Sequence, residues 1–320
     1  MEKYNNIKRV MVSGWVYELD DKELTAGIYT GHADGQEILT LPTEIMVDGI
    51  AYTVTSIELG AFDSENSIKE LIIPDTYEFV ERYAFENCNN LRRVKIGTGL
   101  ENFPYWGFPG CPIEDVTVDP DNPYIRVTND GVIMLTLEEE SVLRAVIKDV
   151  PELTVPEGVT TIGICAVSCH KKLKTLRLPS TLKTILCNGI FNNESLEELI
   201  VPEGVRKAGK HSLCLNKSLK LIDLPSTLDK IGIEAIAYNN NLQTLILRSH
   251  AVVSFPEAKY YHRHSVLADE LIGELRQTTT HDGLPVDSCR LLVPSHLIQK
   301  YKSHPYWGKF KHIEPINDER

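Results

Sequence analysis

Proline recurs at a fixed interval of 23 residues in the middle of the chain, at Pro156, Pro179, Pro202 and Pro225. The interval continues where proline itself is replaced, because Arg248 keeps the same spacing and Gly97 follows Pro74 by 23 residues. A fixed period of this length is typical of solenoids, in which each coil packs only against its neighbours. The chain is therefore expected to form a stack of equal coils.

In each unit, a short segment of alternating apolar residues precedes the proline or the residue that replaces it. These segments are 71–73, 176–178, 199–201, 222–224 and 245–247. Period-two alternation is typical of a strand whose first and third residues face inward and whose middle residue faces outward. Proline ends such a strand because it has no N–H for the ladder. We therefore expect one buried column that contains Leu176, Leu199, Ile222 and Leu245.

A second set of positions recurs in the same register. A small residue followed by an apolar one, as in Ala84-Phe85, comes later in each unit. Four residues beyond the small residue stand Glu65, Cys88, Cys111, His170, Asn193, Asn216 and Asn239. An inward asparagine at a tight corner can satisfy backbone N–H and C=O groups and stack on its equivalents. Cysteine is small and apolar enough to replace it.

These residues resemble the BspA-like bacterial leucine-rich repeats, whose unit reads roughly L-x-x-I-x-I-P-x-x-V-x-x-I-G-x-x-A-F-x-x-C/N-x-x-L. The resemblance covers about residues 15–250 and 289–316, and 173–222 match well. The expected fold class is α/β: a right-handed leucine-rich-repeat solenoid with 23-residue coils, short strands on one face, hairpin insertions and terminal caps. The resemblance also implies an interaction or adhesion-type module at the cell surface or secreted. Met1 to Gly14, by contrast, show no apolar core of a secretory signal.

The organisation expected along the chain has six parts. They are an N-terminal β cap (1–40), leucine-rich repeats (41–118), an inter-repeat hairpin insertion (119–150), further repeats (151–250), an irregular or helical insertion (251–288) and a C-terminal cap (289–320). Two strands of the first cap are expected to join through Asp20-Asp21-Lys22, and Asp48-Gly49 predicts a hairpin turn. Strand candidates in the insertion are 125–127, 132–135 and 142–147. An amphipathic helix is expected at 266–276.

Charge limits the partners. The chain has 33 Lys and Arg against 45 Asp and Glu, a net charge of −12, and no basic run. Nucleic acids and anionic membranes require clustered cations, so neither is expected as a partner. No apolar stretch approaches the roughly 20 residues that a spanning helix needs. An unknown protein or surface ligand, or a second copy of the chain in a homo-oligomer, is expected instead.

Metal and cofactor sites are not expected. The seven cysteines are an odd number without a C-x-x-C pair, and Cys165-x-x-x-Cys169 alone is a weak zinc signal, so we interpret them as buried structural thiols. His262, His264, His281 and Asp282 could together suit zinc or nickel, but histidines on a polar surface loop are the favoured interpretation. The sequence lacks G-x-S-x-G, G-x-x-x-x-G-K-[ST], H-E-x-x-H and G-x-G-x-x-G. A non-catalytic scaffold is therefore predicted.

The candidate binding residues are the middle, outward residues of the first strands: Ile72, Lys95, Arg177, Ile200, Asp223 and Ile246. Exposed isoleucines favour association, although β-propensity alone could explain them. Tyr105 and Trp106 form a second candidate, since both types are enriched at interfaces, or they cover the break in the repeat near residue 112. Residues 305–308 are expected to pack in the cap.

Three functions remain open from the sequence. The first is a protein-binding module that uses the sheet face, and the second is a self-assembling structural scaffold. The third is a carbohydrate-binding module, in which exposed aromatic side chains would act with acidic residues.

Overall fold

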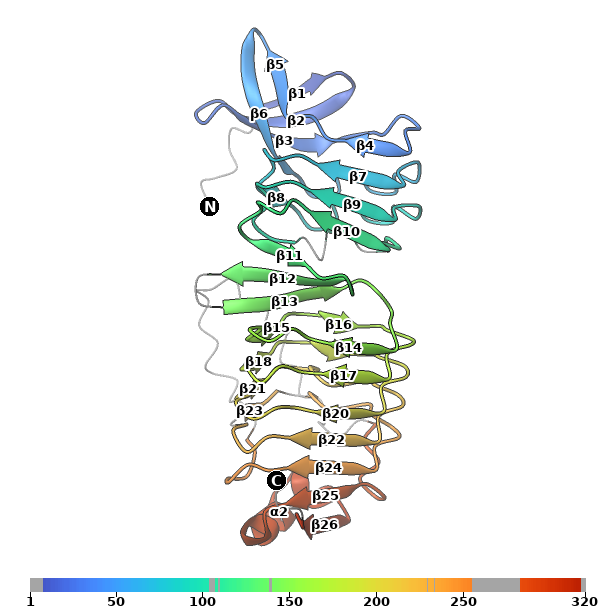
Figure 1. The fold of residues 1–320 in the computed structure, drawn as a ribbon, viewed down its shortest axis with the longest axis vertical. Coiled ribbons are helices and arrows are strands. Elements are labelled where there is room, and N and C mark those ends of the chain that lie inside the picture. The colour runs from blue at the N-terminus through green and yellow to red at the C-terminus, as the bar shows by residue number, and fades with distance from the viewer. Residues whose placement is uncertain are drawn as a thin grey trace. The chain divides into compact units, whose positions relative to one another are not determined.

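The computed structural model describes residues 8–103, 107–108, 110–137, 140–228, 230–232, 234–254 and 283–317. The chain divides into two compact units, Met1–Leu137 (unit 1) and Glu138–Arg320 (unit 2), and each is described by itself. Both consist of short strands joined by tight turns (Figure 1).

Unit 1 begins with a six-stranded sheet of order β1-β2-β3-β6-β5, to which β8 is added beside β6. The strands are β1 (Lys8–Val12), β2 (Trp15–Asp20), β3 (Thr25–Thr30), β5 (Glu44–Val47), β6 (Ile50–Ile57) and β8 (Phe79–Val80). Strands β2 and β3 are antiparallel, as predicted. The predicted hairpin at Asp48-Gly49 is also confirmed, because Val47 of β5 pairs with Ile50 of β6.

A second, parallel sheet of unit 1 has the order β10-β9-β7-β4. Its strands are β4 (Ile38–Thr40), β7 (Glu70–Ile73), β9 (Arg93–Ile96) and β10 (Asp115–Val118). Leu71 pairs with Leu39 on one side and with Val94 on the other, and all three are buried. The predicted strands at 125–127 and 132–135 are present as the antiparallel pair β11 (Ile125–Val127) and β12 (Val132–Leu137).

Unit 2 repeats the parallel arrangement. One edge holds the pair β14 (Glu152–Thr154) and β17 (Thr175–Arg177) and the sheet β20 (Glu198–Ile200), β22 (Leu221–Leu224), β24 (Thr244–Leu247), β25 (Arg290–Val293) and β26 (His312–Pro315). Leu199 pairs with Ile222, and Ile222 with Leu245. These residues and Leu176 are buried, so the predicted apolar column is confirmed. Figure 1 shows its strands lying one above another.

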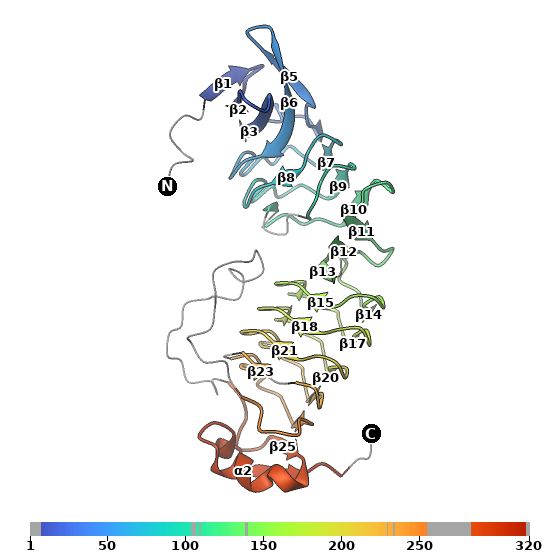
Figure 2. The same ribbon diagram turned by 90° about the vertical axis from the view of Figure 1, so that its left-hand side faces the viewer.

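The opposite edge of unit 2 carries a second row of short strands (Figure 2). They are β13 (Glu140–Val146), β15 (Thr161–Ile162), β18 (Thr184–Ile185), β21 (Lys207–Ala208) and β23 (Lys230–Ile231), with the pair β16 (Val167–Ser168) and β19 (Ile190–Phe191) at the corner. Ile162 pairs with Ile185, and Ile185 with Ala208, at an offset of one 23-residue coil. Each coil therefore adds a strand to both edges.

Helix is scarce in the part of the chain that the structure describes, where it comprises η2 (Ser295–Leu297), α2 (Ile298–Ser303) and η3 (Trp307–Lys309). The α/β label expected from the sequence is therefore not confirmed, and the fold is a mostly-strand solenoid. Short strands and tight turns account for the about 23 residues of a coil, so a helix has no place in it. The helix expected at 266–276 lies outside the described residues.

The C-terminal helical turns pack against the last coils through buried aromatic rings. Trp307 is fully buried, and its indole Nε1 donates to the Val253 carbonyl at 3.1 Å. The ring of Tyr306 meets Trp307 edge-on, with centroids 4.6 Å apart. Of residues 305–308, Tyr306 and Trp307 are therefore packed in the interior, whereas Pro305 and Gly308 are exposed.

A ladder of phenylalanine rings fills the interior of unit 1. Phe62 stacks on Phe85 with centroids 5.0 Å apart, and Phe85 stacks on Phe108 at 5.3 Å. Trp15 of β2 closes the stack by packing edge-on against Phe62 at 5.3 Å. Gly31 is required beside this ring, because a Cβ there would lie 2.3 Å from Phe62. The repeated small-plus-apolar positions thus form one continuous aromatic core.

Candidate functional site

In unit 1, the outward row of the parallel sheet is a network of charges. Lys95 of β9 is exposed, as expected for an outward residue, whereas Ile72 of β7, expected to be exposed, is half-buried. Lys95 Nζ lies 2.8 Å from one Glu70 carboxylate oxygen, and Arg93 Nε donates to the other at 2.9 Å. These two cations hold the pKa of Glu70 below its ordinary value of 4.5. Lys95 is thus tied into an ion-pair network on the face that was predicted to bind.

The lowered pKa of Glu70 predicts a pH-dependent contribution to stability. A carboxylate whose folded-state pKa is depressed contributes stability above its unfolded pKa of about 4.3, and that contribution is lost as pH falls through the folded value. Glu70→Gln is therefore expected to lower the free energy of unfolding at pH 7 and to lose this effect in acid. Urea unfolding at pH 7 and below pH 4 measures the difference, and an equal loss at both would contradict it.

In unit 2, the outward residues differ from one another in exposure. Arg177 is exposed and lies 3.2 Å from Glu152 of the preceding coil. Ile200 is 44% exposed, whereas Asp223 and Ile246 are only 4% and 8% exposed. The expectation that Ile246 is exposed is therefore wrong. The Asp223 carboxylate is paired with Arg248 of the following coil, whereas Ile200 keeps an open surface.

Arg248 is a partner of this face that the sequence interpretation missed. Its Nε and Nη2 donate to the two carboxylate oxygens of Asp223 at 2.7 and 2.9 Å. The offset is 25 residues, one coil plus two, which also separates Glu152 from Arg177 and Glu70 from Lys95. Opposite charges 25 residues apart in the sequence could therefore have predicted this ion pair.

Several predicted positions lie outside the described residues. They are Tyr105, Trp106, the helix at 266–276, and the histidine positions His262, His264 and His281 with Asp282. Within the described ranges, no group of three or more histidine, cysteine, aspartate or glutamate side chains is placed to hold a metal ion.

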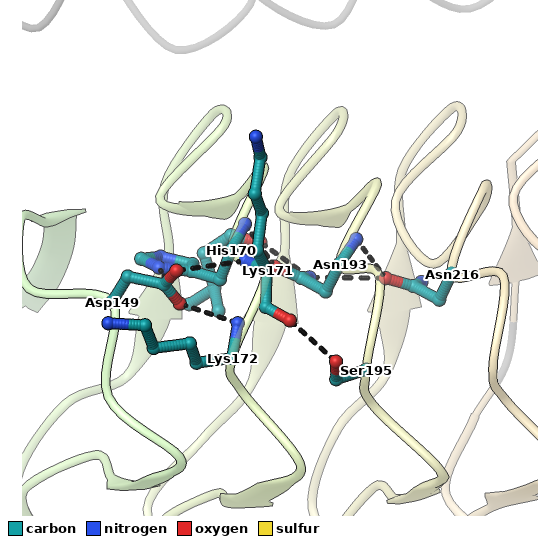
Figure 3. A network of polar contacts seen from close by, with 8 residues as sticks. Asp149, His170, Lys171, Lys172, Asn193, Ser195 and Asn216 are labelled. Carbon is teal, nitrogen blue, oxygen red and sulfur yellow. Dashed lines mark hydrogen bonds and ion pairs between the residues drawn. The ribbon is translucent and has the colours of Figure 1, made fainter.

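The corner column of unit 2 is a continuous hydrogen-bond ladder (Figure 3). The backbone N–H of His170 donates to Asn193 Oδ1 at 3.1 Å, and that of Asn193 donates to Asn216 Oδ1 at 3.0 Å. The backbone N–H of Asn216 donates in turn to Asn239 Oδ1 at 2.9 Å. Each asparagine Nδ2 donates to backbone carbonyls of its own or the preceding coil. The predicted role of these asparagines is confirmed.

Asp149 lies at the N-terminal end of this ladder. Its carboxylate accepts hydrogen bonds from the backbone N–H groups of Lys171 and Lys172, at 3.1 and 2.9 Å (Figure 3). The His170 Nδ1 lies 3.7 Å from Asp149 Oδ1. Burial lowers the pKa of His170, and the Asp149 carboxylate opposes that shift. This polar group satisfies the backbone N–H groups of Lys171 and Lys172 at a corner of the coil.

The predicted burial of the cysteines is confirmed for Cys88, Cys187, Cys214 and Cys289, whereas Cys111 and Cys165 are half-buried. Cys88 and Cys111 occupy the corner column of unit 1, where their thiols donate to the carbonyls of Phe62 and Phe85 at 3.2 and 2.9 Å. All seven cysteines are free thiols, and burial raises the pKa of Cys214 and Cys289 to about 12. Cys169 is exposed, so its predicted burial is wrong.

Stacked parallel strands on both edges, with asparagine or cysteine at the corner, define a repeat protein of the leucine-rich type. The family model described as "BspA type Leucine rich repeat region" matches residues 50–128 and 147–265 in six copies, which is more than half of the chain. The chain belongs to the BspA-type leucine-rich repeat family. Such repeats are commonly protein-interaction modules and generally non-enzymatic scaffolds.

Solved structures resemble the chain at low identity. A leucine-rich repeat protein from Bacteroides ovatus is 17% identical with a TM-score of 0.48, covering 96% of this chain and 76% of its own. A leucine rich cell surface protein from Faecalibacterium prausnitzii is 15% identical with a TM-score of 0.40, covering 76% and 89%. The pneumococcal vaccine antigen PcpA is 13% identical with a TM-score of 0.39, covering 98% and 99%. No curated protein matches the chain.

None of the helices in the described residues has the length and apolar character needed to cross a membrane.

Proposed function

We propose that this chain is a non-catalytic protein-interaction scaffold that binds a protein ligand at the bacterial surface or on a host cell. The contact would be made by the outward faces of the parallel sheets whose strands precede the repeated proline positions. The observation that carries the proposal is Ile200, the one large apolar side chain among the described residues of unit 2 that is strongly exposed.

The surroundings of Ile200 support this role. Glu198 of the same strand and Arg177 of the preceding coil are both exposed. An apolar side chain surrounded by charged ones resembles the arrangement of protein interfaces, in which a desolvated centre is enclosed by a polar rim. Because Ile200 lies on an end strand of its sheet, it contributes little to the core. Its replacement should therefore affect binding more than folding.

The remaining parts of the proposal follow the sequence expectations. We infer that 1–40 and 289–320 act as caps, that 119–150 and 251–288 are insertions, and that 41–118 and 151–250 carry the repeats in a right-handed path. Exposed apolar columns at the ends of a solenoid need such covers. Tyr105 and Trp106 stay candidate contacts together with Ile72, Lys95 and Arg177, whereas the buried Asp223 and Ile246 do not.

Ile200→Glu tests the proposed surface. This variant is expected to bind at least about tenfold more weakly to protein ligands that the wild-type chain selects on a protein array, because a carboxylate would be buried without a partner. Lys207→Glu on β21 is the control, since Lys207 is exposed on the other edge. Circular dichroism and urea unfolding establish that both variants are folded.

The outcomes separate the candidate functions. Unchanged binding by Ile200→Glu would remove this surface from the proposal. If light scattering shows a wild-type oligomer that Ile200→Glu dissociates, the face serves self-assembly instead. Selection of glycans and not proteins would favour the carbohydrate-binding alternative.

A further inference from the structure

Exposed large apolar side chains are concentrated in unit 1. Among the described residues they are Met11, Leu24, Tyr29, Ile38, Met46, Ile50, Leu59, Phe79, Tyr83 and Leu137 in unit 1 and Ile200 in unit 2. Single exposed apolar residues need no explanation, but a contiguous group marks an interaction site. Four of these residues, Tyr29, Leu59, Phe79 and Tyr83, lie on neighbouring coils at the edge formed by β3, β6 and β8. We call them the aromatic edge.

Backbone pairing brings these side chains together. Phe79 of β8 pairs with Ser56 of β6. The N–H of Glu58, the residue before Leu59, donates to the Ile28 carbonyl at 2.9 Å and so brings Leu59 near Tyr29 of β3. The exposed fractions of Leu59 and Phe79 are 62% and 50%. Two neighbouring coils thus present large side chains that the core does not use.

Tyr83 occupies a position that disfavours it. The residue before the small residue of the coil has a positive φ throughout the described array. These residues are Gly60 (66°), Tyr83 (59°), Cys165 (52°), Asn188 (53°), His211 (54°) and Glu234 (55°). Glycine and asparagine adopt this left-handed conformation with little strain, whereas a bulky aromatic residue does so at a cost of about 1 kcal/mol or more. The Tyr83 ring is 40% exposed, so packing offsets little of that cost. Tyr83 thus adds a large exposed ring to this edge.

The charge around the aromatic edge indicates the kind of partner. Unit 1 contains 10 Lys and Arg against 23 Asp and Glu, whereas unit 2 contains 23 against 22. Glu58 and Glu81 lie at equivalent positions of successive coils beside the edge. Burial, together with the charges of Glu18 and Glu81, raises the pKa of Glu58. A surface that covers these carboxylates must bring positive charge to avoid burying them unpaired.

The aromatic edge already binds one cation of the chain itself, the guanidinium of Arg9. The Arg9 guanidinium lies 3.5 Å from the centroid of the Tyr29 ring. Two of its nitrogens donate to a Glu18 carboxylate oxygen at 2.9 and 2.6 Å. A ring and a carboxylate thus hold an arginine side chain between them, a combination that gains from both cation–π attraction and charge pairing. Glu58 on the next coil, with Phe79 and Glu81 on the coil after it, offers the same chemistry.

We propose that the aromatic edge of unit 1 docks a positively charged polypeptide segment of a protein partner. The apolar side chains of the segment cover Leu59, Phe79 and Tyr83, and its lysine or arginine side chains pair with Glu58 and Glu81. This surface lies on a different sheet from Ile200, so it goes beyond the proposed function and can succeed or fail independently of it.

Fluorescence anisotropy with labelled synthetic peptides tests the proposal on the full chain. A peptide of lysine and leucine is expected to bind, and peptides with glutamate for lysine or serine for leucine are expected to bind at least about tenfold more weakly. Phe79→Ser combined with Tyr83→Gly should weaken binding of the lysine and leucine peptide by about tenfold or more. Glu81→Gln should weaken it by a smaller factor. Tyr83→Gly alone should raise the midpoint of urea unfolding while it lowers affinity, a combination that a purely structural tyrosine would not give.

Matched controls keep the charge of unit 1 unchanged. Met46→Ser, at the exposed tip of the β5–β6 hairpin, should leave the affinity within about twofold, because it removes an exposed apolar side chain away from the edge. Ile200→Ser should also leave it unchanged, which separates this proposal from the one for unit 2. Three outcomes would overturn the proposal. The serine-containing peptide could bind as tightly as the leucine-containing one, Met46→Ser could weaken binding as much as the double variant, or the double variant could leave binding unchanged. Binding of neutral oligosaccharides at this edge in place of the peptide would do so as well.

Discussion

Replacing Asn216 by alanine is expected to destabilise unit 2 by about 3 kcal/mol. The Asn216 side chain accepts hydrogen bonds from the N–H and the Nδ2 of Asn193, at 3.0 and 3.1 Å (Figure 3). It also donates to the carbonyls of Ile190 and Leu213, both at 3.1 Å. Alanine leaves these buried groups unsatisfied, and each such group costs about 1–3 kcal/mol.

Asn241→Ala is the matched control for this prediction. Asn241 Nδ2 also donates to a carbonyl of the preceding coil, that of Lys217 at 2.7 Å, but the contact is exposed to water. Loss of an exposed hydrogen bond is expected to cost less than about 1 kcal/mol, because water replaces the partner. Urea unfolding combined with hydrogen exchange of peptides from unit 2 measures both variants. Equal effects of the two substitutions would contradict a structural role for the ladder.

Phe85→Ala is expected to destabilise unit 1 by about 3–5 kcal/mol, the usual cost of removing a large aromatic side chain from a core. Phe85 is fully buried and stacks on both Phe62 and Phe108, so its loss removes two ring contacts and leaves a cavity. Aromatic pairs contribute about 0.5–1.5 kcal/mol beyond the burial of their area. Neighbouring rings cannot close the gap, because the coil backbones fix their positions.

Phe79→Ala provides the comparison within the same unit. Its ring is half exposed on β8, so we expect the stability of unit 1 to change by about 0.5 kcal/mol or less. Hydrogen exchange of peptides from β7 and β9 reports on unit 1 separately from unit 2. If Phe85→Ala were as stable as Phe79→Ala, the stack would not be the stabilising core that its geometry indicates.

Much of this architecture is predictable because the solenoid depends on one repeated distance. A 23-residue interval places Leu199, Ile222 and Leu245 above one another whatever the rest of the coil does. The same reasoning predicts the asparagine ladder, since an inward polar side chain at a corner has only backbone groups to bind. The turn at Asp48-Gly49 is predictable from local backbone preference.

The exposure of the outer face is not predictable in the same way. Alternation gives the direction of Asp223 and Ile246 but not what covers them. The carboxylate of Asp223 is buried under Arg248 of the next coil, a contact that alternation alone does not identify. Cys169 shows the opposite error, because a small side chain beside a corner can equally face water.

The aromatic edge was also missed, although the sequence contains a signal for it. Gly60 and Tyr83 are equivalent positions one coil apart, and the glycine shows which conformation the coil requires. Other coils place Cys165, His211 and Glu234 at this position, so the signal is the large aromatic side chain and not the positive φ alone. Aligning coils by backbone requirement, as well as by apolar pattern, would have identified it.

The asparagine ladder of unit 2 has a direction, since each backbone N–H donates to the side chain of the following coil from His170 to Asn239. An insertion or deletion of residues between His170 and Asn239 must therefore keep each backbone N–H opposite the side chain that accepts from it. Genetic lengthening or shortening of the array is therefore expected to proceed by duplication or deletion of whole coils, because a shift of a single residue would break the corner contact of the coil in which it occurs.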